Sequence, residues 1–404
     1  MINKINNKEQ IIYILCIIEI LLFLPRIAFY VASYYLPNIL GLPFVEFSFF
    51  FSFFILILLV NITKIFPKFE FIFLFYIFLV FLISCINSPV KDCFYEVQGI
   101  CMLIIDFSIF RISTYQNDMG IKLLKSIVII VGTFIIIFCL SYILSPNLMD
   151  KTSSTILDYR MEGVITSSIA MGLFSAIFVF LEKKYSNIYI VVFGLISLLL
   201  LLFTTVTRTI IISCSIMLIL LYVLKLIFHK IHIKNVINIF LIYSCIIGIA
   251  FLIMKNSFPT YTDLINYRFS EMYYDNYDNY RKIERNRELE LISNSPFIGY
   301  GVGLKNKLKM QPERGRTFFG HNFYTSQLLR YGFVGFCVFS LFIIYVISSY
   351  FNLKKLDINI FIISMTLVIG ISISLYFANF IYYLSTGLYG AIFGIFSNFK
   401  KFSS

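Results

Sequence analysis

The chain carries little charge for its length. Of its 404 residues, 13% are Asp, Glu, Lys or Arg and 59% are hydrophobic, whereas a soluble domain is roughly 25% charged. This composition excludes an ordinary soluble protein and predicts a polytopic membrane protein. Sustained alternation of apolar and polar residues is also missing, which argues against a membrane-spanning β-barrel and predicts an all-α fold.

Several motifs that would indicate other chemistry are missing too. The eight cysteines include no Cys-x-x-Cys pair and lie in or beside apolar runs, so we expect neither a disulfide framework nor a zinc site. No compact basic domain carries the net charge of +12, and nucleic acid is therefore not an expected partner. No nucleotide-sugar site or paired-carboxylate metal motif is evident. We expect no cofactor and no metal.

Long apolar runs are what the sequence has in abundance. Runs of about 17 to 25 residues recur along the chain, each long enough to cross a hydrocarbon core roughly 30 Å thick. They predict about twelve transmembrane helices in a single integral membrane domain over residues 1–404. The expected centres lie near residues 22, 53, 78, 103, 134, 172, 196, 218, 245, 340, 366 and 387. The first run lacks a cleavage site, which predicts a retained helix.

Basic residues predict the orientation. If both termini are cytoplasmic, the short basic clusters all fall on the cytoplasmic side, as the positive-inside rule requires. The clusters are Lys4 with Lys8, Lys64 with Lys68, Arg111 with Lys122 and Lys125, Lys183 with Lys184, Lys230 with Lys234, Lys354 with Lys355, and Lys400 with Lys401. The same orientation places two longer polar segments outside, at residues 145–163 and 255–320. The larger one, between the ninth and tenth helices, is too small for an independent core.

Glycines, a proline, a histidine and arginines converge at one place outside the apolar runs. Residues 294–304 read NSPFIGYGVGL, and residues 320–335 read GHNFYTSQLLRYGFVG. This pattern resembles the O-antigen polymerase and O-antigen ligase superfamily, in which a Pro-x-x-Gly-x-Gly turn precedes a His-Asn that opens a membrane helix ending in Gly-x-x-Gly. Pro296, Gly299 and Gly301 stand at the turn positions. The resemblance is specific over residues 281–335.

The resemblance implies a fold, a location and substrates. It implies a class C glycosyltransferase-like membrane protein of the bacterial inner membrane, whose large periplasmic loop carries catalytic residues. The donor would be an oligosaccharide linked to undecaprenyl diphosphate, and the reaction would need no metal. Expected partners are lipid-linked oligosaccharides, the lipid bilayer and a protein that regulates chain length.

Arginines in the large loop are the first candidates for the site. Residues 281–292 predict a modest amphipathic helix on which Arg281, Arg285 and Glu288 share a face, with Arg287 nearby. Arginine suits phosphate because its planar fork binds two oxygens at once and keeps its charge. A solvated helix laced with Glu–Arg pairs is the structural alternative. In the family, an arginine about fifteen residues before the proline belongs to the active site, and Arg281 stands 15 residues before Pro296.

The histidine at the mouth of a predicted span is the second kind of candidate. His321 can orient or deprotonate a sugar hydroxyl near neutral pH, with Asn322 and Tyr324 beside it. The alternative is an ordinary interfacial residue. Arg208, which matches the family's short Ser-Arg motif except for threonine before it, would grip a diphosphate or merely reach toward headgroups.

A few other charged residues stand in unusual places. Arg160 and Glu162, on the smaller loop, could join a phosphate site. Glu19, Glu46 and Asp106 fall within or near apolar spans, where a carboxylate is either functional or hydrogen-bonded between helices.

These residues favour a glycosyl transfer on the outer face of the membrane. The preferred hypothesis is an O-antigen or capsular polysaccharide polymerase in which Arg281, Arg285 and Arg208 neutralise the leaving diphosphate and His321 activates the acceptor hydroxyl. Chain length and the residue usage, rich in Ile, Phe, Asn and Lys, favour the polymerase over an O-antigen ligase that transfers glycan to lipid A core. A lipid-linked oligosaccharide flippase is the alternative of another class. It would place charges at the bilayer midplane, whereas the charges here gather at one face.

Overall fold

The computed structural model describes residues 7–32, 38–39, 42–115, 119–144, 163–182, 184–205, 208–229, 248, 276–304, 322–377 and 386–398. Twelve helices lie in this described part, together with one two-stranded antiparallel pair. The helices are α1 (Asn7–Ala32), α2 (Phe44–Thr63), α3 (Lys68–Cys85), α4 (Val90–Thr114), α5 (Met119–Leu144), α7 (Gly163–Leu181), α8 (Ile188–Thr205), α9 (Arg208–His229), α12 (Asn276–Asn294), α13 (Phe323–Leu356), α14 (Ile358–Phe377) and α15 (Gly387–Ser397). The strands are β1 (Asn38–Ile39) and β2 (Leu42–Pro43).

The protein is a polytopic membrane protein, as its composition predicts. Five helices, α3, α4, α5, α13 and α14, are long and apolar enough to cross a membrane, and several shorter apolar helices accompany them. Eleven of the twelve expected spans coincide with apolar helices in the described part. The expected span near residue 245 lies outside it. The remaining helix, α12, is polar and falls in the large loop, where a helix is predicted over residues 281–292.

Helix α4 forms the centre of the bundle. Of its apolar span, 89% is buried, whereas only 17% of α3 and 22% of α13 are buried. The short α15 packs along α4 because glycines let the two backbones approach closely. A Cβ added at Gly390 would lie 2.2 Å from the Leu103 carbonyl oxygen, and one at Gly394 would lie 2.5 Å from that of Phe107. The poorly buried α3 and α13 therefore form much of the lipid-facing surface.

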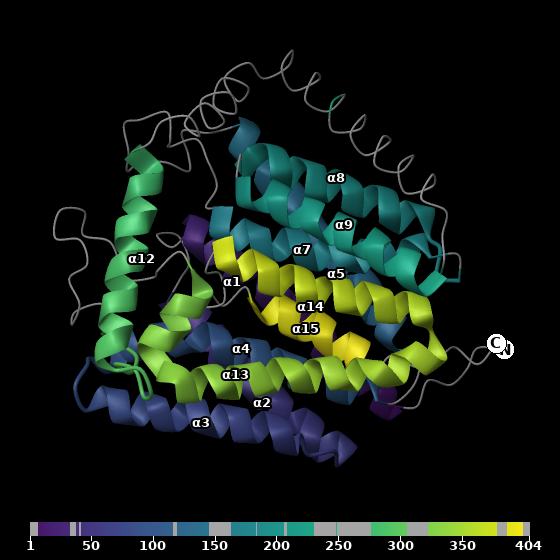
Figure 1. Ribbon diagram of the computed structural model, residues 1–404. Coiled ribbons are helices and arrows are strands. Elements are labelled where there is room, and N and C mark those ends of the chain that lie inside the picture. Colours follow the sequence, from purple (N-terminus) through teal and green to yellow (C-terminus); the bar gives the residue numbers. More distant parts are fainter. Residues whose placement is uncertain are drawn as a thin grey trace.

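The two ends of the bundle differ in character. At one end the start of α3, the end of α4 and the last third of α13 meet in a polar cluster, where Arg111 contacts both Glu70 and Tyr345. Lys68, at the start of α3, and Arg111 in this cluster are two of the basic residues that the charge rule assigns to the cytoplasm. At the opposite end α12 lies across the direction of the spanning helices, near the end of α3 and the start of α13 (Figure 1). The polar helix thus covers the end that the same rule assigns to the outside.

Candidate functional site

Three glycines shape the turn that follows α12. Gly299, Gly301 and Gly303 have φ angles of 72°, 78° and 79°, in the left-handed region that residues with a Cβ rarely adopt. The space around them is also filled. A Cβ on Gly301 would lie 2.5 Å from the Ser84 hydroxyl oxygen, and one on Gly303 would lie 2.7 Å from the Cys93 sulfur. The turn therefore lies directly against the connection between α3 and α4.

A kink in α13 receives the turn. Gly332 interrupts α13 with φ 62° and ψ −168°, which frees backbone groups on either side of it. The turn takes up four of them, because the N–H groups of residues 300 and 301 donate to the carbonyls of residues 329 and 330 at 2.8 and 2.9 Å. In return, the N–H groups of residues 333 and 334 donate to the carbonyls of residues 296 and 297 at 2.8 and 3.1 Å. The turn and the kinked helix thus form one hydrogen-bonded unit.

The kink should not tolerate a side chain. Alanine at position 332 is expected to destabilise the protein by about 1–3 kcal/mol through its backbone conformation alone, and its Cβ would lie 2.3 Å from the Phe297 carbonyl oxygen. The melting temperature in detergent, followed with a thiol-reactive dye, measures the loss. Gly172→Ala, within α7, is the control, because the nearest atoms to a Cβ there belong to the side chains of Leu388 and Ile392 and lie 3.1 Å or more away. Equal stability of the two variants would contradict this account.

A buried ion pair joins the same unit to α4. Oε2 of Glu96 accepts hydrogen bonds from Arg330 Nε at 2.8 Å and from the Gly303 N–H at 3.0 Å, and Oε1 accepts from the Leu304 N–H at 3.1 Å. The side chains of Glu96 and Arg330 are 4% and 0% exposed. The Val302 N–H donates to the Ser84 hydroxyl at 2.9 Å. One carboxylate thus connects α4, the turn and α13.

The start of α13 is tied to α12 as well. Asn322 caps α13, since its side-chain oxygen accepts from the N–H groups of Tyr324 at 2.9 Å and Thr325 at 3.4 Å. The Thr325 hydroxyl donates to the carboxylate of Glu288 on α12, and Glu288 is 1% exposed. The arginine-bearing helix therefore contacts α13 within one turn of its N-terminal cap.

The structure describes some of the predicted arginines in full and others only by the helix to which they belong. Arg281, Arg285 and Arg287 all belong to α12, and Arg208 is the first residue of α9. Arg285 and Arg287 are exposed. The structure describes the backbone of Arg281 and Arg208 but not their side chains. His321, Arg160 and Glu162 lie entirely outside the described part.

Neighbouring positions on α12 differ in burial. Glu288 is buried against α13, whereas Arg285, three residues earlier in the helix, is exposed. The turn that ends α12 brings Leu291 and Ile292 against Leu304 and Leu329. The helix therefore docks through a narrow edge, which leaves most of its charged surface accessible.

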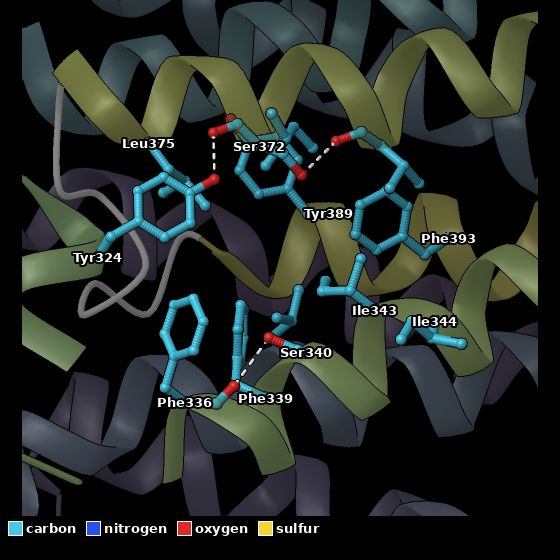
Figure 2. Close-up of a pocket in the computed structure, with 13 residues that line it drawn as sticks. Tyr324, Phe336, Phe339, Ser340, Ile343, Ile344, Ser372, Leu375, Tyr389 and Phe393 are labelled. Carbon is cyan, nitrogen blue, oxygen red and sulfur yellow. Dashed lines mark hydrogen bonds between the residues drawn. The ribbon is translucent and has the colours of Figure 1, made fainter. Parts of the chain in front are cut away.

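An apolar cavity of about 240 Å³ lies inside the bundle next to this start of α13. Tyr324 stands at one end, with its hydroxyl donating to the Ser372 carbonyl at 2.5 Å, and Phe336 and Phe339 face it from the lower side (Figure 2). The walls come from α13, α14, α15 and Leu103 of α4. Ile344, also in the lining, is 58% exposed. The cavity thus reaches the lipid-facing side of α13 and could accommodate part of a hydrocarbon chain.

Two of the carboxylates singled out in apolar spans have a partner. Arg26 Nη2 lies 2.8 Å from Glu19 Oε1, Arg26 Nη1 lies 3.4 Å from Asp106 Oδ2, and all three side chains are 0% exposed. Ser48 and Ser52 on α2 also bind this guanidinium. The cluster joins α1, α2 and α4, which favours the structural alternative for Glu19 and Asp106. The side chain of Glu46 is outside the described part.

The sequence analysis missed the residues that hold the site together. Glu96 and Arg330 were not singled out, although both are buried, and Glu288 was named only as a neighbour of the arginines on α12. A signal existed for two of them, because Glu96 lies within the span expected near residue 103 and Arg330 within the span that follows His321. An ionisable residue inside a span needs a partner, so the sequence could have indicated that each has one, although it does not identify the partner.

Part of the chain matches a known protein family. Residues 193–340 match the family model Wzy_C, described as O-Antigen ligase. The match includes Arg208, all of α12, the turn and the kinked first part of α13. No curated protein matches the chain.

Proposed function

We propose that this chain, which belongs to the O-antigen ligase family through its residues 193–340, is a polysaccharide polymerase. Members of this family are glycosyl-transferring enzymes of the bacterial inner membrane that act on lipid-linked glycans. The proposed reaction joins oligosaccharide repeat units carried on undecaprenyl diphosphate at the outer face of the membrane. Each transfer releases undecaprenyl diphosphate.

One observation carries this proposal. The turn binds α12, which bears three arginines, to the kinked α13, whose cap follows His321 directly. An arginine-bearing helix is therefore hydrogen-bonded to α13 at one end of the bundle, and the candidate base directly precedes the cap of α13 in the sequence. Rigid attachment matters because proximity of reacting groups accounts for a large part of a catalysed rate.

The chemistry follows from the residue types. In the proposed step, the bond between the anomeric carbon and the diphosphate oxygen of the donor breaks, and Arg281, Arg285 and Arg208 stabilise the negative charge that develops on the leaving group. His321 takes the proton from the acceptor hydroxyl as the new glycosidic bond forms. Arg287 and Arg160 would add positive charge around the diphosphate. Asn322, which caps α13, and Tyr324, at the mouth of the cavity, would position the lipid-linked substrate.

The apolar cavity supports a lipid-linked substrate. It begins at Tyr324, two residues after the cap of α13, and its lining is mostly apolar. A hydrocarbon chain can therefore enter the bundle beside the charged site without burying a polar group.

The decisive experiment is a transfer assay with purified protein in detergent. A single authentic lipid-linked repeat unit, without nucleotide or added metal, is expected to yield a ladder of multiples when the glycans are separated by size. Transfer only to added lipid A core would instead identify a ligase, the activity that the family description prints. Absence of both products with the authentic substrate would count against the proposal and favour a transporter.

A further inference from the structure

The tip of the turn is apolar and open to its surroundings. Phe297 and Ile298 are 68% and 79% exposed, although they lie between the charged helix α12 and the buried ion pair of Glu96. Two adjacent, large and exposed apolar side chains at the end of a polar helix are unfavourable in water. The surfaces next to Phe297 and Ile298 therefore indicate whether water, lipid or protein covers these two side chains.

Measured along the spanning helices α3 and α13, the tip lies within their length and not beyond their ends. The Phe297 carbonyl accepts from the Val334 N–H at 3.1 Å, and a Cβ on the next residue, Gly335, would lie 2.9 Å from the Tyr76 hydroxyl. Helix α3 continues for nine residues beyond Tyr76, to Cys85, which corresponds to roughly 13 Å along its axis. The tip thus lies below the end of α3 and alongside its apolar final turns.

The neighbouring surfaces face lipid. On α13, Phe333 and Val334 are 55% and 49% exposed, and on the final turns of α3, Leu82 and Ile83 are 46% and 63% exposed. Because α3 and α13 are the least buried of the five long spans, these side chains belong to the bilayer-facing side of the bundle. Phe297 and Ile298 continue that surface.

The residues before the tip have the opposite character. On α12, Arg285, Arg287 and Glu290 are exposed, and residues 291–296 separate Glu290 from Phe297. A charged stretch followed by an apolar tip matches the boundary between lipid headgroups and hydrocarbon.

We propose that Phe297 and Ile298 insert into the hydrocarbon of the adjacent bilayer leaflet and anchor the C-terminal end of α12 at the level of the headgroups. The occupant of this surface is lipid, because the tip is continuous with the lipid-facing sides of α3 and α13. The anchor places the arginines of α12 at the height at which the phosphates of membrane lipids lie. It holds whether or not the protein polymerises glycans, since it requires only the turn and the bilayer.

The chain contains no tryptophan, which permits a direct test. Ile298→Trp in the full-length protein is reconstituted in nanodiscs of phosphatidylcholine, either plain or brominated near the headgroup end of the acyl chains. Bromine quenches indole fluorescence only over short distances. We expect blue-shifted emission and roughly a twofold loss of intensity in the brominated lipid, as for a side chain 5–10 Å into the interface.

Two matched variants set the scale. Phe78→Trp, on the lipid-facing side of α3 where Phe78 is 52% exposed, supplies the signal of a membrane-embedded residue. Glu290→Trp, exposed on α12, supplies that of a residue outside the hydrocarbon. All three proteins should elute from size exclusion as the parent does, and a misfolded Ile298→Trp protein is replaced by Phe297→Trp.

The outcomes separate the possible environments. Quenching of the position 298 indole close to that of Phe78→Trp supports the anchor. Red-shifted, unquenched emission like that of Glu290→Trp would overturn it, because the tip would then lie in water. Blue-shifted emission without quenching would also overturn it, since a second protein chain would then cover the tip. None of these readouts depends on glycosyl transfer, so the anchor and the proposed reaction fail independently.

Discussion

Alanine in place of Arg281 or His321 is expected to lower the rate of polymer formation at least about 100-fold while the amount of protein in the membrane stays unchanged. Removing one group that stabilises developing negative charge costs roughly 100- to 1,000-fold in rate, and removing a general base costs roughly 100- to 10,000-fold. The glycan ladder formed from lipid-linked repeat units measures both effects.

Two further variants make this result specific. Lys91→Ala removes a cation that is exposed near the start of α4 and stacks on Tyr95, and it should leave the ladder nearly unchanged. Arg281→Lys keeps the charge but loses the planar fork, so it should recover only part of the activity. Normal chain length in both alanine variants would refute the proposed roles of Arg281 and His321.

Alanine in place of Glu96 should be the most damaging single change to the architecture of the site. It would leave the fully buried guanidinium of Arg330 without its carboxylate and would deprive the Gly303 and Leu304 N–H groups of their acceptor. Breaking a buried pair from one side costs about 3–5 kcal/mol. We expect the melting temperature in detergent to fall by roughly 5–10 °C, with loss of polymer formation.

The matched control is another glutamate in an ion pair. Glu182 lies 2.6 Å from Lys225, but these side chains are 12% and 18% exposed, and Glu182→Ala should cost about 1 kcal/mol or less. The double variant Glu96→Ala, Arg330→Ala should be more stable than the sum of the two single changes, because it leaves no unpaired buried charge. Additive losses would show that the two side chains do not act as a pair.

These two predictions probe different levels of the same site. Arg281 and His321 are assigned from the sequence pattern and its family, whereas Glu96 and Arg330 are assigned from contacts. If the contacts position the chemistry, Glu96→Gln should preserve much of the fold through its remaining oxygen yet reduce the rate, because the turn would be held less firmly. A Glu96→Gln protein with normal stability and a normal ladder would separate the ion pair from the function.

Much of the fold follows from the sequence because a bilayer imposes simple rules. An apolar run of sufficient length must form a helix to satisfy its backbone in hydrocarbon, so eleven expected spans coincide with described helices. The polar helix α12 was also predictable, because residues 281–292 favour a helix but are too polar to enter lipid. Their prediction required no knowledge of neighbours.

The candidate site was only partly predictable. The glycines at 299 and 301 indicated a turn, and positive φ angles at both explain why glycine stands there. The sequence showed Gly332 only as part of the Gly-x-x-Gly motif in a predicted helix and did not indicate a kink. The kink depends on hydrogen bonds to residues 296 and 297. A break inside a helix is stable only when a partner takes up the freed backbone groups, and sequence periodicity does not reveal that partner.

The membrane class, the approximate helices and the segment rich in charge and glycine could all be predicted from the residues. The buried contact between Glu96 and Arg330, 234 residues apart, and the packing of the turn on the kinked α13 became evident only in the folded protein. So did the binding of Arg26 by Glu19 and Asp106. The physical reason is that burial of a helix depends on its own composition, whereas a buried charge is stable only beside a partner that folding brings to it.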